Sequence, residues 1–187
     1  MVKAVVFLAP GFEEIEASTI VDVLRRCGVG VTIAGLTAGL IEGSHGIKFA
    51  SDIVVENLEV ADYDAVICPG GAPGYENLMR NTKVIVAIKK AFKLNKLVAA
   101  ICAAPAVLSK AGVLEGKDCT IYPGMESDLL RGGGKPKKEI VVADGNVITS
   151  MGPATALPFA LELAARLVGP NVVKEVKERT LTQMVLK

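Results

Sequence analysis

Short apolar runs alternate with stretches of helical periodicity along this chain. Residues 2–9 form an apolar run broken only by Lys3, residues 10–12 read Pro-Gly-Phe, and apolar side chains then recur at helical spacing until Gly28. The same succession returns several times. Alternation of this kind is typical of βαβ units, in which helices cover a mostly parallel sheet. We therefore predict an α/β fold.

The pattern predicts seven strands and five helices. The predicted strands are residues 2–9, 29–36, 65–68, 97–101, 118–122, 140–143 and 147–150, the last two joined by an Asp-Gly-Asn turn. The predicted helices run from Ile15 to the stop at Gly28 and over residues 84–92, 103–110, 155–168 and 172–184. Residues 37–55, which contain three glycines, are interpreted as a hairpin-like excursion.

The length of the chain predicts one domain spanning residues 1–187. At this size roughly 70% of the unfolded surface can be buried, so a single core needs no disulfide or structural metal. Of the side chains, 51% are hydrophobic, with three Tyr, five Phe and no Trp, which suits buried parallel strands and offers few platforms for stacking on bases. The formal charge of +1 gives no overall electrostatic reason to bind nucleic acid or an anionic membrane.

Membrane spans and targeting signals are not predicted. The longest apolar run without charge, residues 97–108, is well short of the roughly 20 residues that a spanning helix needs. The first residues lack the small-residue cleavage pattern of a signal peptide and turn acidic at Glu13 and Glu14. We expect a soluble cytoplasmic protein with no membrane and no specific nucleic-acid partner.

The cysteine spacing excludes two common classes of site. The four cysteines are Cys27, Cys68, Cys102 and Cys119. No C-x-x-C pair exists and His45 is the one histidine, so zinc-finger and thioredoxin-like sites are excluded. Nucleotide motifs are also incomplete, because the first βα turn has Gly11 alone and residues 112–117 are one residue short of a Walker A loop. We expect no metal and no cofactor.

Three loops of unusual composition follow predicted strands. They are residues 10–16 (Pro-Gly-Phe-Glu-Glu-Ile-Glu), 69–74 (Pro-Gly-Gly-Ala-Pro-Gly) and 99–105 (Ala-Ala-Ile-Cys-Ala-Ala-Pro). In an open parallel sheet, ligands bind at the carboxyl ends of the strands, beside the switch in strand order. We therefore expect all three loops to open at one edge of the sheet.

Cys102 is the strongest candidate for chemistry. It falls on a sharp turn from strand to helix, where a nucleophile needs small neighbours, and the flanking positions are mostly alanines. The positive end of the following helix is expected to lower the pKa of the thiol. The alternative is a small core residue, because free cysteines are among the most buried side chains. The local pattern alone does not decide between the two.

Gly70 and Gly71 are candidates for an oxyanion site. Glycines let the backbone approach a bound atom, and an N–H here, together with that of Ala103, would hold a developing negative charge on oxygen. Pro-Gly-Gly is also a common turn with no role in binding. Both interpretations stay open at this point.

Glu16 is the candidate acid or base. It lies in the first turn of the first helix, where the helix dipole favours a carboxylate without any function. The helical phase points Ile15, Thr19 and Val23 at the core and sets Glu16 beside that stripe. Its carboxyl is therefore expected to be partly buried and able to pass a proton to a nearby thiol.

Glu13, Glu14 and His45 are explained without a catalytic role. The helix dipole accounts for the two carboxylates. His45 would partner a cysteine only if residues 37–55 reach the site, and is otherwise a loop histidine.

Four motifs in chain order point to a known family. They are residues 10–16, Pro69-Gly70-Gly71, residues 100–105 (Ala-Ile-Cys-Ala-Ala-Pro) and residues 150–155 (Ser-Met-Gly-Pro-Ala-Thr). Together they resemble the DJ-1/PfpI (ThiJ) superfamily, and its DJ-1 branch in particular, over nearly the whole chain. The resemblance implies a flavodoxin-like three-layer sandwich with a nucleophile-elbow cysteine, usually assembled as a homodimer. It makes Cys102 the reactive cysteine, Glu16 the carboxylate that hydrogen-bonds it, and Gly71 and Ala103 the backbone donors.

Three departures separate this chain from parts of that superfamily. The protease-like branch carries histidine directly after the cysteine, where this chain has Ala103, which disfavours a cysteine peptidase. The DJ-1 branch often places a histidine before a proline to face the cysteine, whereas here Tyr122 precedes Pro123. Tyrosine donates a hydrogen bond but is a poor base at neutral pH. Met151 stands where some members have arginine, so an anion pocket there is in doubt.

The resemblance implies covalent chemistry on small reactive carbonyls without a cofactor. In this hypothesis Cys102 attacks the aldehyde of a 2-oxoaldehyde such as methylglyoxal, Glu16 shuttles protons, and lactate is released, as in glyoxalase III; a deglycase activity on the same adducts is related. The alternative is a redox-responsive sensor or chaperone-type protein whose Cys102 is oxidised to a sulfinate.

Overall fold

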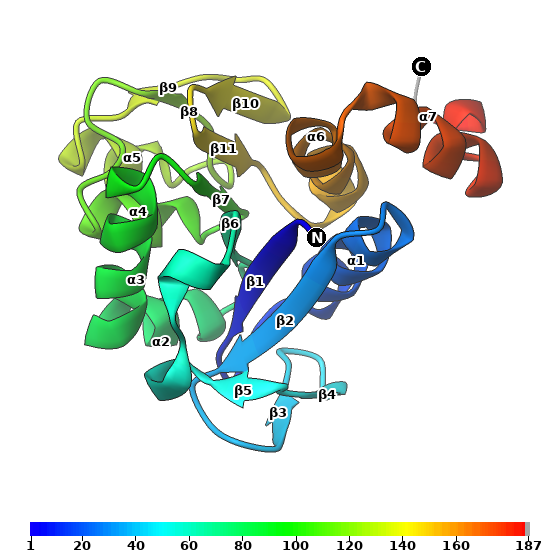
Figure 1. The fold of residues 1–187 in the computed structure, drawn as a ribbon. Coiled ribbons are helices and arrows are strands. Elements are labelled where there is room, and N and C mark those ends of the chain that lie inside the picture. The colour runs from blue at the N-terminus through cyan, green and yellow to red at the C-terminus, as the bar shows by residue number, and fades with distance from the viewer. Residues whose placement is uncertain (186–187) are drawn as a thin grey trace.

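A computed structural model describes residues 1–185 (Figure 1). The strands are β1 (Lys3–Leu8), β2 (Gly30–Gly35), β3 (Leu40–Glu42), β4 (Lys48–Ala50), β5 (Ile53–Val54), β6 (Ala65–Cys68), β7 (Leu97–Ile101), β8 (Asp118–Cys119), β9 (Lys135–Pro136), β10 (Val141–Asp144) and β11 (Val147–Ser150). The helices are α1 (Glu14–Arg26), α2 (Gly74–Arg80), α3 (Thr82–Lys93), α4 (Pro105–Lys110), α5 (Glu126–Arg131), α6 (Ala156–Val168) and α7 (Pro170–Arg179).

Seven strands form the central sheet in the order β10-β11-β7-β6-β1-β2-β5. Every pair is parallel except β10 with β11, which form an antiparallel hairpin at one edge. The chain passes from β1 outward through β2 and β5, then returns to place β6 on the other side of β1. The strand order therefore switches direction between β1 and β6, which is where ligands bind in open α/β sheets.

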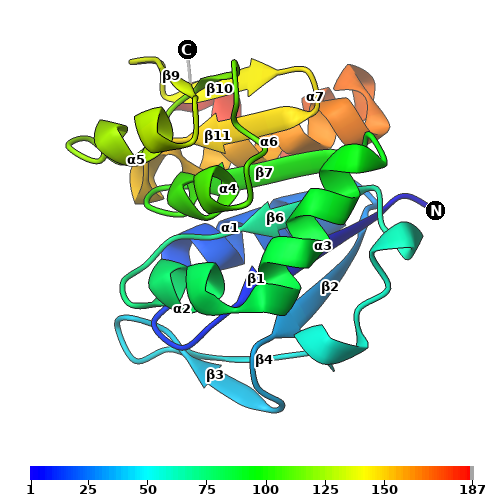
Figure 2. The same cartoon turned by 90° about the vertical axis from the view of Figure 1, so that its left-hand side faces the viewer.

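Helices cover both faces of the sheet and make a three-layer sandwich. Helices α2, α3, α4 and α5 lie on one face, while α1, α6 and α7 lie on the other (Figures 1 and 2). Strand β1 shows why its sequence is almost continuously apolar: Val6 and Leu8 pack into the core beneath α1 and α6, and Val5 and Phe7 into the opposite core. The predicted α/β architecture with a mostly parallel sheet is confirmed.

Several predicted elements differ from the observed ones. Helices α2 and α5 were not predicted, and the strand predicted over residues 118–122 stops at Cys119. The last predicted helix, residues 172–184, begins earlier and ends at Arg179, where it is followed by a short 3-10 turn. The hairpin predicted within residues 37–55 is confirmed as the antiparallel pair β3–β4. Within residues 1–185, no helix is long and apolar enough to cross a membrane.

The phase predicted for α1 was wrong at its start. Ile15 is 56% exposed, whereas Glu16 is fully buried and Ala17 and Ile20 continue the buried stripe. The stripe is therefore shifted by one residue relative to the prediction. A carboxylate, and not an isoleucine, points from the first turn of α1 into the protein.

Candidate active site

Three neighbouring strands bring the candidate residues together. Glu16 follows β1, Gly70 and Gly71 follow β6, and Cys102 follows β7, and these strands are adjacent in the order β7-β6-β1. A Cβ built on Gly70 would lie 2.6 Å from the Cβ of Cys102 and 3.0 Å from Oε2 of Glu16. The prediction that the loops meet at one edge of the sheet is confirmed, and Gly70 is the point at which they touch.

Cys102 occupies a sharp turn between β7 and α4. Its φ is +63°, in the left-handed region that non-glycine residues seldom adopt. The turn is held by its own backbone, since the N–H of Cys102 donates to the carbonyl of Ser150 at 3.0 Å and its carbonyl accepts from the N–H of Tyr122 at 2.9 Å. Ala103 and Ala104 are buried against the turn, while Cys102 itself is half-buried. The predicted elbow is thus present.

Glu16 is a buried carboxyl with one hydrogen-bonded oxygen. Oε2 accepts the backbone N–H of Gly70 at 2.7 Å, whereas the buried Oε1 has no hydrogen-bond partner among residues 1–185. Burial raises the pKa of Glu16 to about 7, although the Gly70 N–H and the neighbouring Cys102 thiol act in the opposite direction. A carboxyl with this pKa both accepts and donates a proton near neutral pH.

The thiol of Cys102 is harder to ionise than the sequence suggested. Burial raises its pKa to about 12 and the charge of Glu16 acts in the same direction, while the N–H groups of Ala103 and Gly71 oppose the rise. The expected lowering by the helix dipole was therefore wrong in net direction, because α4 has only six residues and burial outweighs it. The neutral thiol therefore predominates at pH 7.

The two glycines after β6 have different roles. The N–H of Gly70 is engaged by Glu16, so its predicted place in the oxyanion site is wrong and it holds the carboxyl instead. The backbone N–H groups of Gly71 and Ala103 act to lower the pKa of the Cys102 thiol, and their role as oxyanion donors, which the resemblance implied, stays a prediction. Gly71 has a φ of +89°, and a Cβ there would lie 2.3 Å from the backbone nitrogen of Glu13. Glycine is therefore required for the loops to pack this closely.

Tyr122 adjoins the site through its backbone. It is 48% exposed, and a Cβ on Gly152 would lie 3.4 Å from Cδ2 of its ring, which places the ring beside the residues that follow β11. Met151 lies in the same stretch and is partly exposed. Neither supplies a strong base next to Cys102, whereas Glu16 is a titratable carboxyl beside it.

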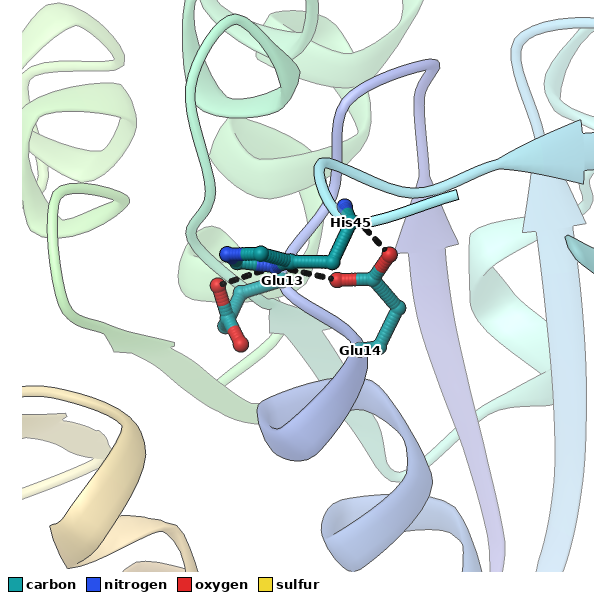
Figure 3. Close-up of side chains that lie close together, drawn as sticks. All are labelled: Glu13, Glu14 and His45. Atoms are coloured by element: carbon teal, nitrogen blue, oxygen red, sulfur yellow. Dashed lines mark hydrogen bonds and ion pairs between the residues drawn. The ribbon is translucent and has the colours of Figure 1, made fainter. Parts of the chain in front are cut away.

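A second cluster lies on the other side of the first turn of α1 (Figure 3). Oε1 of Glu14 accepts the backbone N–H groups of His45 at 2.6 Å and Ile47 at 3.3 Å, and Oε2 lies 3.0 Å from Nδ1 of His45. Glu13 lies 3.6 Å from the same ring nitrogen. Sequence reasoning missed this clamp because the partners are 31 residues apart and the helix dipole sufficed to explain both carboxylates.

The charges of this cluster differ from those of the cysteine site. Burial would raise the pKa of Glu14, but the hydrogen bonds from His45 and Ile47 outweigh it and lower the pKa to about 2. The hydrogen bond to Glu14 raises the pKa of His45, as do the charges of Glu13 and Glu14. His45 therefore joins the β3–β4 hairpin to α1, and within the described residues its contacts are with Glu13, Glu14 and Ser44 rather than with a cysteine.

Glu13, Glu14 and His45 are the group within residues 1–185 whose side-chain oxygen and nitrogen atoms lie close enough together to hold a metal ion. The candidate ligand atoms of Glu13, Glu14 and His45 lie within 4.8 Å of one another. The Glu14 carboxylate is nevertheless occupied by backbone and ring donors of the hairpin. The geometry is that of a hydrogen-bonded clamp.

Comparison with known proteins identifies the family. The model of the DJ-1/PfpI family matches residues 2–166, and the chain belongs to this family. The chain is 40% identical to Protein dj-1beta of Drosophila melanogaster over 96% of both chains, and 38% identical to the Parkinson disease protein 7 homolog of Danio rerio over 94% of both.

Solved structures of relatives share the fold. The crystal structure of Drosophila melanogaster DJ-1beta superposes with a TM-score of 0.91 at 39% identity, covering 96% of this chain and 97% of that one. The structure of oxidised Toxoplasma gondii DJ-1 also gives 0.91, at 32% identity over 97% and 98% of the chains. The flavodoxin-like sandwich that the resemblance implied is confirmed.

Proposed function

We propose that this protein is a cysteine enzyme that converts small 2-oxoaldehydes to 2-hydroxy acids without a cofactor. The observation that carries the proposal is the position of the Glu16 carboxyl beside the Cys102 thiol. This carboxyl is fully buried, accepts a hydrogen bond from the Gly70 N–H, and has a pKa of about 7. Such a pair generates a nucleophile by proton transfer within the site. Membership in the DJ-1/PfpI family agrees with this chemistry at the coarser level of the family.

The first step forms a hemithioacetal. The Cys102 proton moves to Glu16, the sulfur attacks the aldehyde carbon of methylglyoxal, and the carbonyl oxygen becomes an oxyanion. In this proposal the N–H groups of Gly71 and Ala103, which favour negative charge on the Cys102 sulfur, also stabilise the oxyanion. Glu16 then returns its proton to the oxygen, so the carboxylate is regenerated.

The second step moves a hydrogen between the two substrate carbons. The Glu16 carboxylate removes the proton from the carbon bonded to sulfur and delivers a proton to the former ketone carbon, which converts the hemithioacetal to a thioester of lactate. The aldehyde carbon is oxidised and the ketone carbon reduced, so no external redox partner is needed. Water then cleaves the thioester, releasing lactate and the thiol. The same attack on aldehyde-derived adducts would give a deglycase activity.

The test is lactate formation from methylglyoxal by the native protein, Cys102→Ser, Glu16→Gln and the control Cys27→Ala. Cys27 is a buried cysteine at the C-terminal end of α1, whereas Glu16 lies in the first turn of that helix. We expect loss of turnover in the first two variants and native turnover in the control, all shown to be folded by circular dichroism. Absence of lactate above buffer with the native protein would refute the proposal.

A second candidate function is oxidation sensing at Cys102. It is favoured by the oxidised state recorded for the Toxoplasma gondii relative and by the protonated Glu16 carboxyl, which is able to donate a hydrogen bond to a sulfinate. Two peroxide molecules would convert the thiol to the sulfinate and be reduced to water. Peptide mass analysis after mild peroxide should show two added oxygens on Cys102 and none on the buried Cys68; an unmodified Cys102 peptide removes this candidate.

We also propose that the protein is a homodimer, as the family resemblance implied. Ile15 and Ile47 are exposed apolar side chains, 56% and 57% accessible, and the Glu14 clamp holds their segments together. An interface between two copies would bury both exposed isoleucines, which favours a docking surface here. Light scattering should give twice the chain mass for the native protein and a shift towards the chain mass for Ile15→Lys. A native protein with the mass of one chain would contradict the proposal.

A further inference from the structure

Charge is distributed unevenly along the sequence. The chain as a whole is nearly neutral, yet residues 77–114 contain seven of its 21 basic side chains and none of its 20 acidic ones. This stretch includes α3 and α4. The rest of the chain therefore has an excess of acidic side chains, and the net charge of +1 conceals two regions of opposite sign.

The fold gathers these cations on one surface. Helix α3 lies on the outer side of the layer opposite α1, facing the viewer in Figure 2. We call a group of exposed side chains on α3, together with Leu94 directly after it, the α3 face; its members on the helix are Lys83, Val86, Lys89, Lys90 and Lys93. Val86 is 59% and Leu94 is 50% exposed, so lysines and apolar side chains alternate on this surface.

Two hollows adjoin on the α3 face and share Val86. One, of about 450 Å³, lies between Val86, Leu94 and the lysines of the last turns of α3. The other, of about 660 Å³, has Met79 and Ile85 among its apolar lining residues. Its remaining lining includes Arg80, Lys110 and Arg131 from α2, α4 and α5. Apolar and cationic side chains thus both line each hollow.

Part of this positive charge has no acidic partner. Arg80 pairs with Glu76 and Arg131 with Asp128, both at 3.0 Å, and Lys90 pairs with Glu59. No ion pair within residues 1–185 involves the remaining four lysines, Lys83, Lys89, Lys93 and Lys110. An anionic partner would complement these four lysines, and its hydrophobic side chains would contact the apolar residues that line the hollows.

We propose that the α3 face binds an acidic peptide segment that carries two apolar side chains. Val86 and Leu94 lie eight positions apart, which corresponds to a rise of ~12 Å along a helix axis. About four residues of an extended peptide span the same distance. A peptide fits better than a single-stranded nucleic acid because no aromatic side chain lines either hollow for stacking on bases. It fits better than a membrane because the α3 face has no Trp or Phe, which helices at a membrane surface insert among the lipids.

Fluorescence anisotropy would test this with a labelled peptide of Asp and Glu that contains two leucines four positions apart. We expect the double variant Lys89→Glu/Lys93→Glu to weaken binding about tenfold. The control Lys174→Glu/Lys177→Glu makes the same charge change on exposed positions of α7 and should leave binding nearly unchanged. Val86→Ser should weaken binding of the leucine peptide more than that of a peptide with serines in place of the leucines.

Three results would overturn the proposal. Equal weakening by both double variants would show that only net charge matters. Equal affinity for the leucine and serine peptides would remove the apolar component. The protein could also bind phosphatidylserine vesicles or single-stranded RNA more strongly than the peptide. If Lys89→Glu/Lys93→Glu abolished that binding, the α3 face would belong to a different partner. Circular dichroism melting of each variant separates these results from unfolding.

Discussion

Glu14 and Glu16 lie two residues apart in the first turn of α1 and face opposite surroundings. Both have little solvent exposure, 4% and 0%, but Glu14 lies near the surface beside the largely exposed His45 ring, whereas Glu16 lies deep in the protein. Glu14 accepts hydrogen bonds from two backbone N–H groups and from the side chains of Ser44 and His45, and its pKa falls to about 2. Glu16 accepts one, and its pKa rises to about 7.

The comparison shows that depth and the number of donors together set the charge state of a carboxyl. A saturated carboxylate such as Glu14 is a fixed anion that fastens the hairpin. A carboxyl left one donor short, such as Glu16, exchanges a proton at physiological pH and is suited to acid–base work. The following predictions separate the two residues by activity, by stability and by titration.

The largest expected difference between substitutions at Glu16 and at Glu14 is in turnover. Glu16→Gln removes the group that takes the Cys102 proton and should lower kcat for methylglyoxal by about 10²-fold or more. Glu14→Gln leaves that group in place, so its kcat should stay within several-fold of native at a temperature where the variant is folded. Steady-state kinetics of the two purified variants gives the comparison. Similar losses in both would mean that the clamp, and not the proton transfer, limits catalysis.

The second difference is the stability of Glu16→Gln at alkaline pH. The folded-state pKa of Glu16 lies above its ordinary value of 4.5, so the folded protein retains a proton that the unfolded chain releases, and this contribution is lost as pH rises from about 4.5 through 7. A neutral Gln avoids the buried charge. Urea unfolding should show Glu16→Gln more stable than native at pH 8 by roughly 3 kcal/mol, with the gain vanishing near pH 4. A gain independent of pH would point to packing instead.

Glu14→Gln should change the free energy of unfolding in the opposite direction from Glu16→Gln, and by less. The lowered pKa of Glu14 stabilises the folded state above pH 4.5, and this stabilisation is lost as pH falls through about 2. The variant keeps some acceptors but loses the charge, so we expect a loss of about 1–2 kcal/mol at pH 7 that shrinks towards pH 3. Urea titrations at pH 7, 5 and 3 measure it. A variant as stable as native at pH 7 would show that the clamp contributes nothing to folding.

The smallest effect is the titration of His45. Its pKa is raised by Glu14 and Glu13, so the stabilisation it provides is complete below its ordinary value of 6.5 and is lost as pH rises through the raised pKa. Because His45 is the one histidine in the chain, its ring proton resonance is unambiguous in an NMR titration. We expect the pKa to fall in Glu14→Gln and to stay raised in Glu16→Gln. An unchanged pKa in Glu14→Gln would show that the ion pair does not form in solution.

The layers of the fold were predictable because β1, β6 and β7 are buried on both faces and therefore read as apolar runs. Helix α2 escaped prediction because it starts at Gly74 without a side-chain cap and has only seven residues. Helix α5 has six and no side-chain cap either. Short uncapped helices form through tertiary packing and leave little periodic signal.

The site was predictable as a set of loops but not in its electrostatics. The elbow at Cys102 and the small residues around it were visible in the sequence, whereas the direction of the thiol pKa depended on burial and on Glu16. The clamp depended on free N–H groups at His45 and Ile47 in the turn of a distant hairpin. Local pattern cannot report which backbone donor meets which carboxylate across the fold.

The left-handed backbone at Cys102 has a consequence for how this chain would drift under selection. A non-glycine residue at φ +63° costs roughly 1–2 kcal/mol relative to glycine. Selection for robustness alone would thus favour glycine at position 102, removing the nucleophile while making the protein harder to melt. Under the proposed function, the strained backbone at position 102 is therefore the stability cost of holding a thiol on this turn.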